Sequence, residues 1–108
     1  MPRNYKLYLN DIIKSIEHIE EYTKKATVDD FMSNQMMQDA VIRNLEIIGE
    51  AVKNLPGSIT ESNEFFWGKY VRMRDLVAHT YFGVNYNIIW GLVKTGLSDL
   101  KSEVRKLL

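Results

Sequence analysis

The segment RDLVAHTY, residues 74–81, holds the side chains with the clearest chemical potential. A guanidinium at Arg74 can bind the oxygen atoms of a phosphate group, and an imidazole at His79 can exchange protons near neutral pH. The chain has no cysteine, which excludes disulfides, thiol nucleophiles and thiolate zinc sites. With only two histidines, a catalytic zinc site is not expected either. The chemistry of this segment should therefore be proton transfer and charge stabilisation without a metal.

Arg74 is unusual because helical periodicity places it on an apolar stripe. At about 100° per residue, the same arc holds Trp67, Tyr70, Val71, Val77, Ala78 and Tyr81. Burying an unpaired guanidinium costs several kcal/mol, so Arg74 must meet a carboxylate or face a cleft or a partner subunit. An internal ion pair with Glu46 or Glu50 is the structural alternative, and structural ion pairs are commoner than catalytic ones.

His79 follows Arg74 by five residues, about 140° around a straight helix, so the two side chains do not share a face. If the corresponding helices of two subunits meet around a two-fold axis, Arg74 and His79 converge on one shared cleft. Arg72, Asp75 and His79 share a separate polar ridge, where Asp75 can orient the imidazole and favour its charged form. A solvated ridge of ion pairs explains the same spacing.

The elements that position these residues are expected to be helices throughout. Only two prolines and six glycines occur, and apolar residues recur at three- and four-residue spacings. The pattern predicts an amphipathic helix over about 5–25 and a second helical stretch over 27–55. A capping box at Thr27 and Asp30 opens the second stretch, in which a small break near Ser33 is allowed.

Further helices are expected after a turn-rich loop over 56–63. Ser62 or Asn63 is expected to cap a third helix that reaches about Thr80, and Asn85 a fourth. The pair Thr95-Gly96 should separate the fourth helix from a last one, which carries Leu97, Leu100, Val104 and Leu107. The sequence thus predicts one all-α domain over 1–108, a bundle of four to five antiparallel helices. Gly49, inside the apolar second stretch, indicates close approach of another backbone.

The segment from Arg74 to Tyr81 resembles the Arg-x4-His-x-Tyr signature of HepT-like toxins, a branch of the HEPN superfamily. The stretch AVIRNLEIIGEAVKNLP, residues 40–56, resembles the second-helix segment of the family. Phe66-Trp67 with Arg72-Met73-Arg74, and Tyr81-Phe82-Gly83-Val84 with Ile88-Ile89-Trp90, resemble the flanks of its motif. A bare Arg-x4-His occurs by chance in many proteins, but with the GEA and YFGV segments at this spacing it is specific. The resemblance covers roughly 1–108, although 1–28 and the last helix match only in pattern.

The resemblance implies an endoribonuclease that needs no metal or cofactor and works as a homodimer. Arg74 and His79 would be its catalytic residues, in a composite site that yields 2′,3′-cyclic phosphate and 5′-hydroxyl ends. An MNT-type nucleotidyltransferase would be the antitoxin partner, and Tyr81 the position where it attaches AMP. The residue after the motif arginine is often Asn and is Asp75 here, which leaves open whether it contacts RNA, orients His79 or supports the fold.

The balance of basic and acidic residues limits the places where RNA could bind. Fourteen basic residues balance fourteen acidic ones, so a broad electropositive surface is excluded and a local site is needed. Arg72 and Lys69 are the candidate RNA contacts, with ordinary surface charges as the alternative.

No apolar run approaches the roughly 20 residues that span a bilayer and no signal peptide is evident, so we expect a cytoplasmic protein without a membrane partner. Two other hypotheses stay open: a non-catalytic HEPN-like module that docks a nucleotidyltransferase, and a structural bundle that only dimerises.

Overall fold

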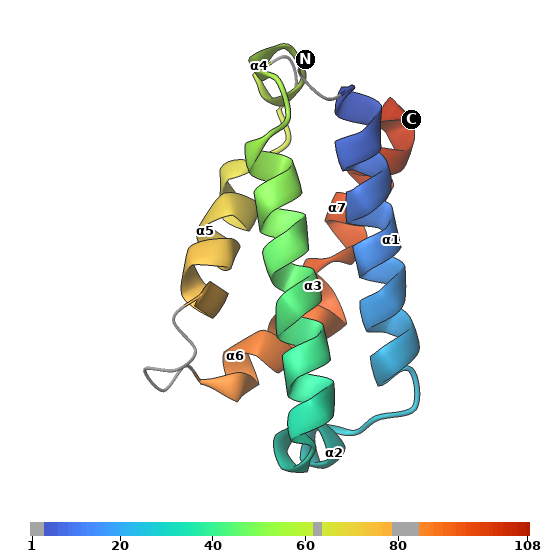
Figure 1. Cartoon of the computed structure of the whole chain (residues 1–108), viewed down its shortest axis with the longest axis vertical. Coiled ribbons are helices and arrows are strands. Elements are labelled where there is room, and N and C mark those ends of the chain that lie inside the picture. The colour runs from blue at the N-terminus through green and yellow to red at the C-terminus, as the bar shows by residue number, and fades with distance from the viewer. Residues whose placement is uncertain (1–3, 62–63, 79–84) are drawn as a thin grey trace.

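Two long helices form the centre of the molecule. The computed structural model describes residues 4–61, 64–78 and 85–108, and within these ranges it contains helices and turns and no strand. α1 (Tyr5–Thr23) and α3 (Gln35–Lys53) lie side by side along the longest axis (Figure 1). The predicted all-α bundle is confirmed.

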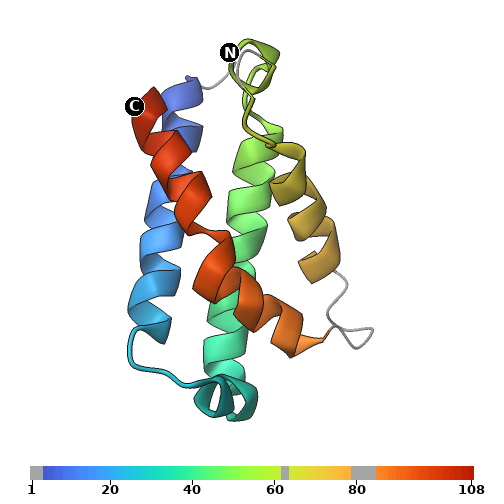
Figure 2. The same ribbon diagram turned by 180° about the vertical axis from the view of Figure 1, so that it is seen from behind.

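The other helices are shorter and surround this pair. They are α2 (Val28–Ser33), α4 (Gly57–Thr60), α5 (Gly68–Ala78), α6 (Tyr86–Gly91) and α7 (Ser98–Leu107), with a π-helical stretch, Leu92–Gly96, between α6 and α7. α5 packs on the side of α3 away from α1, as both views show, and α7 packs along α1 (Figure 2). The described part of the chain thus carries seven α-helical segments rather than four or five, because the expected second stretch is divided and the expected loop contains a short helix.

Local capping explains where the first helices begin and end. The predicted capping box is confirmed: Thr27 Oγ1 accepts from the backbone N–H of Asp30 at 3.1 Å, and the Asp30 carboxylate accepts from Thr27 N–H at 2.9 Å. Asn34 has extended backbone angles, ends α2 and caps α3 by accepting from the N–H of Met37 at 3.0 Å. The break expected near Ser33 is therefore confirmed. It arises because Asn34 ends α2 and its side chain caps the start of α3.

The core is built from the apolar stripes that the sequence predicts. It joins side chains of α1, α3, α5 and α7: Leu9, Ile12, Ile16 and Ile19; Val41, Leu45, Ile48 and Val52; Tyr70, Met73 and Val77; Leu100 and Val104. Burying a side chain of this size contributes about 1.5–3 kcal/mol relative to leaving it exposed. α3 contributes to the core along most of its length and packs against both α1 and α5, which makes it the central helix.

α5 begins later than predicted. Its first residue is Gly68, because the preceding residues form an aromatic turn in which the N–H of Trp67 bonds to the carbonyl of Phe65 at 3.1 Å. The Phe65 ring lies 4.8 Å from the Trp67 ring and 5.8 Å from the Tyr70 ring. Packing of these rings takes the place of a first helical turn. The expected caps Ser62 and Asn63, and the expected end near Thr80, lie outside the described residues.

The elements on either side of α5 follow the sequence pattern in part. Residues 57–60 form the one-turn helix α4, whereas the whole stretch 56–63 was predicted to be a loop. The cap at Asn85 is confirmed, since its side chain accepts from the N–H of Asn87 at 2.8 Å. The predicted separation at Thr95-Gly96 is the end of the π-helical stretch. Among the described helices, none is long and apolar enough to cross a bilayer.

Candidate active site between α3 and α5

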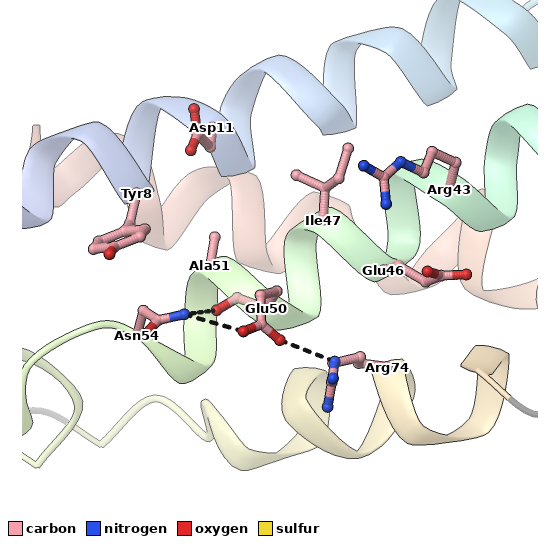
Figure 3. A pocket seen from close by; sticks show the side chains of 9 residues that line it. All are labelled: Tyr8, Asp11, Arg43, Glu46, Ile47, Glu50, Ala51, Asn54 and Arg74. Carbon is pink, nitrogen blue, oxygen red and sulfur yellow. Dashed lines mark hydrogen bonds and ion pairs between the residues drawn. The ribbon is translucent and has the colours of Figure 1, made fainter. Parts of the chain in front are cut away.

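Arg74 projects from α5 towards α3 and pairs there with Glu50. Its Nε lies 3.0 Å from Glu50 Oε2 (Figure 3). Of the two carboxylates that the sequence offered, Glu50 is the partner, whereas Glu46 makes no ion pair with Arg74. The Arg74 side chain is 36% exposed and that of Glu50 is 53% exposed. The arginine that the helical pattern placed on the buried stripe thus lies at its edge, open to solvent.

The ion pair leaves the far end of the guanidinium available. Glu50 engages Nε, and Nη1 lies 3.6 Å from Oδ1 of Asp75. Neither of these ion pairs is made through Nη2. An arginine has five N–H donors in a planar fork, so the Nη groups of Arg74 retain donors for a phosphate group.

Gly49 allows α5 to approach α3 at this point. A methyl group on Gly49 would overlap the Cβ of Arg74 and would lie 3.1 Å from the backbone oxygen of Tyr70. The close backbone approach predicted at Gly49 is therefore confirmed. Asn54, one turn after Glu50, donates its Nδ2 to the Glu50 backbone oxygen at 2.8 Å and lies 3.4 Å from Oε1. The segment from Gly49 to Asn54 both brings Arg74 close and holds its partner carboxylate.

A surface groove of about 330 Å³ opens beside this pair, between α1 and α3. Figure 3 shows the side chains that line it: Tyr8, Asp11, Arg43, Glu46, Ile47, Glu50, Ala51, Asn54 and Arg74. Three of these residues are acidic and two are basic. A phosphate group would be repelled by the three carboxylates, so its favourable positions in the groove are beside Arg74 and Arg43.

The other residues proposed for the site lie partly outside the described residues. His79 and Tyr81 belong to the stretch 79–84, which the structure does not describe, so their place beside Arg74 stays a prediction. Lys69, Arg72 and Asp75 lie on α5 and are all exposed. Two of them, Arg72 and Asp75, belong to the predicted polar ridge, whose third member, His79, lies outside the described residues. The structure brings Asp75 to Arg74 and leaves Lys69 and Arg72 on the outer surface of the helix.

Tyr70 anchors α5 to the end of the π-helical stretch Leu92–Gly96. Its hydroxyl donates to the backbone oxygen of Gly96 at 3.1 Å, and its side chain is 2% exposed. Burial, with a smaller contribution from the negative charge of Asp99, raises the pKa of the Tyr70 hydroxyl above its usual value of 10.0. The neutral phenol is the form that holds α5 in position.

Sequence reasoning did not single out Glu50 over Glu46, and it gave Asn54 no role. A usable signal was present, because Gly49 marks the register at which the two helices come closest. The carboxylate directly after Gly49 is the one that faces the arginine.

Comparison with known proteins identifies the family of this chain. The model of the ribonuclease HepT-like family matches residues 12–107, and several relatives match the chain at 36–48% identity over nearly its full length. The protein therefore belongs to the ribonuclease HepT-like family of helical proteins. No solved structure gives a significant match.

Its relatives come from archaea and bacteria. A probable ribonuclease HepT of Thermococcus cleftensis is 44% identical, over 99% of this chain and 98% of that protein. A putative RNase of Caldanaerobacter subterraneus subsp. tengcongensis is 39% identical, over 94% of this chain and 91% of that protein. A gamma-glutamylcyclotransferase and putative RNase of Methanocaldococcus jannaschii is 48% identical. That match covers 100% of this chain but only 49% of the relative.

Proposed function

We propose that this protein is a metal-independent endoribonuclease that cleaves RNA with Arg74 and His79 in a site shared by two copies. The observation that carries the proposal is Arg74 itself, oriented by Glu50 at the mouth of a groove with Nη donors to spare. Relatives named as ribonucleases support RNA as the substrate. The proposal therefore combines a guanidinium suited to bind phosphate with relatives that are named as probable or putative ribonucleases.

RNA carries its own nucleophile, which limits what the protein must supply. The 2′-oxygen attacks the phosphorus, the bond from phosphorus to the 5′-oxygen breaks, and one proton moves from the first oxygen to the second. We assign this proton transfer to His79, a type of step that contributes about 10²–10⁴-fold. The Nη groups of Arg74 stabilise the negative charge of the pentacoordinate phosphorane. The products are a 2′,3′-cyclic phosphate and a 5′-hydroxyl.

Two copies are required because of helix geometry. Arg74 is turned towards α3, and a continuing helix would direct His79 about 140° away from it. A second copy across a two-fold axis supplies the missing partner, so that Arg74 of one copy works with His79 of the other. Asp75, near Arg74 and four residues before His79, is suited to orient the imidazole.

Regulation would act on the same site. The proposed antitoxin is an MNT-type nucleotidyltransferase, and its proposed target is the hydroxyl of Tyr81. AMP attached there would place an anion close to Arg74, which would repel the substrate phosphate and obstruct the cleft. The protein would then act as a toxin only while Tyr81 is unmodified.

The test compares purified wild type with Arg74→Ala and His79→Ala on labelled RNA. Cleavage by the wild type alone, with 2′,3′-cyclic phosphate ends, supports the proposal. Equal cleavage by all three proteins, or none by the wild type, contradicts it and favours a binding module without activity. Intact mass after incubation with ATP and the nucleotidyltransferase tests Tyr81, with Tyr81→Phe as the control that should gain no AMP.

A further inference from the structure

An exposed aromatic ring precedes α5 and is covered by an arginine of that helix. Phe66 is 59% exposed, although it directly precedes the buried Trp67. The guanidinium carbon of Arg72 lies over the Phe66 ring, 4.8 Å from its centre. A large apolar ring in water is unfavourable by itself, and an exposed cation–π contact offsets this only weakly. Fold stability alone gives little reason for this arrangement.

The absence of a side chain at Gly68 creates room for the pair. A Cβ at that position would lie 3.2 Å from the Phe66 ring and 3.8 Å from Nη2 of Arg72. Gly68 is the first residue of α5, so the ring folds back over the start of the helix and meets the arginine one turn further along. The ring and the guanidinium are thereby held together on the surface.

The helix that follows Phe66 is basic in a chain without net charge, although the exposed Glu64 precedes the ring by two residues. α5 holds three cations, Lys69, Arg72 and Arg74, against the single carboxylate of Asp75. Arg74 is neutralised by Glu50 on the inner side of the helix. Lys69 and Arg72 remain on the outer side, one turn apart and both exposed. An aromatic face flanked by cations is the chemistry that binds unpaired bases and their phosphates.

We propose that Phe66 and Arg72 form a stacking platform for an unpaired base of single-stranded RNA, with the adjoining phosphate held by Lys69. The inference rests on the proposed ribonuclease function and deepens it, because it names unpaired RNA as the substrate class. In a duplex the bases are stacked on one another and cannot reach the ring. The platform therefore selects loops and single strands over helical RNA.

The platform is separate from the phosphate clamp. Arg72 precedes Arg74 by two residues, so the two side chains point in directions about 200° apart around α5. A helix with its side chains is about 10–12 Å across, so the stacked base belongs to a neighbour of the nucleotide that is cut. Phe66 should therefore change the affinity for RNA, and with it KM, and leave kcat nearly unaltered.

The experiment measures binding of a fluorescent single-stranded oligonucleotide carrying 2′-O-methyl groups, which cannot be cleaved. Phe66→Ala should weaken binding about tenfold, within the roughly 1–3 kcal/mol that one stacked base contributes. Phe66→Trp should retain or improve binding, and Arg72→Lys should weaken it less than Arg72→Ala does. Tyr22→Ala is the matched control, because Tyr22 is also an exposed aromatic, 42% exposed and stacked on His18 at 6.0 Å. It should bind as the wild type does.

A duplex of the same sequence, and a single strand with abasic positions, complete the test. Phe66→Ala should have little effect on either, because neither offers an unpaired base. If the wild type cleaves RNA but Phe66→Ala binds single strands with unchanged affinity, the platform is wrong and the ribonuclease proposal stands. If light scattering shows that Phe66→Ala abolishes dimers, the ring is a contact between copies and the platform is also wrong. A wild type that neither binds nor cleaves RNA would overturn the proposed function itself.

Discussion

At the scale of single residues, the Arg74–Glu50 pair is best explained by orientation rather than by stability. Both side chains are more than one-third exposed, and ion pairs in such positions contribute about 0–1 kcal/mol to folding. Glu50 contacts Nε, Asp75 lies 3.6 Å from Nη1, and Asn54 in turn restrains Glu50. This geometry fits a guanidinium that is held in a fixed position before a substrate phosphate binds.

Replacing Glu50 should therefore affect activity more than stability. We expect Glu50→Gln to lower kcat about tenfold and Glu50→Ala to lower it more, towards the 10²-fold that a misplaced catalytic group costs. Thermal denaturation should show little change, since the pair is exposed. RNA cleavage kinetics and melting curves check both statements.

Glu46→Gln provides the control for this experiment. Glu46 lies one turn earlier on α3, lines the same groove and makes no ion pair with Arg74. Its substitution should leave kcat within about twofold of the wild type, as for surface changes away from specific contacts. Equal losses in the two variants would show that the general charge of the groove matters and that Glu50 has no special role.

At the scale of helices, the contact between α3 and α5 depends on Gly49. Gly49→Ala should destabilise the protein by about 1–3 kcal/mol, the usual cost of overpacking, because the added methyl group would overlap Arg74 Cβ. α5 would have to move outwards, which also displaces Arg74 from Glu50. Chemical denaturation measures the loss, and RNA cleavage measures the displacement.

Gly91→Ala is the matched control for Gly49→Ala. Gly91 has helical backbone angles, and no atom lies within 4 Å of a Cβ built there. Because alanine is favoured over glycine in helices by about 0.5–1 kcal/mol, Gly91→Ala should stabilise the protein slightly. Destabilisation by both substitutions would mean that the loss at Gly49 does not come from the α3–α5 contact.

Tyr70 gives the attachment of α5 a dependence on pH. Its pKa is raised above 10.0 in the folded protein, so the native state favours the neutral phenol. The corresponding stabilisation is complete below pH 10 and is lost as the pH rises through the folded-state pKa. We expect Tyr70→Phe to lose about 0.5–1.5 kcal/mol at neutral pH, the value of one hydrogen bond. The gap between wild type and Tyr70→Phe, measured by urea unfolding, should narrow above pH 10; a constant gap would contradict the assignment.

The elements that the sequence predicted well are those whose signals are local. The capping box at Thr27, the cap at Asn85 and the apolar stripes of α1 and α3 depend on residues within one or two turns of each other. The start of α5 was misplaced because it depends on the rings of Phe65 and Trp67 packing on Tyr70, which helical periodicity does not register. The choice of Glu50 over Glu46 likewise depends on the register between two helices. Arg74 was recognised as out of place on its stripe, and its partner was left between two candidates.

At the scale of the whole molecule, the proposal concerns assembly, because Arg74 and His79 of one chain are expected to point in different directions around a helix. Arg74 is committed to the α3 side of α5 by its bond to Glu50. If His79 of a second copy completes the site, the active unit has two equivalent sites, each built from both chains. A dimer can then be assembled in which one site is intact and the other has lost both groups.

Co-expression of Arg74→Ala and His79→Ala chains with different affinity tags provides that dimer. Each variant alone should be inactive, because each homodimer lacks one group in both sites. The purified heterodimer should regain about half of the wild-type activity per dimer, since one of its two composite sites then contains both an arginine and a histidine. A heterodimer as inactive as its parents would show that Arg74 and His79 act within the same chain, or that both histidines are needed at once. The double variant Arg74→Ala/His79→Ala paired with wild type separates these outcomes: it should be inactive when the site is built across the two chains, and half-active when each chain carries its own.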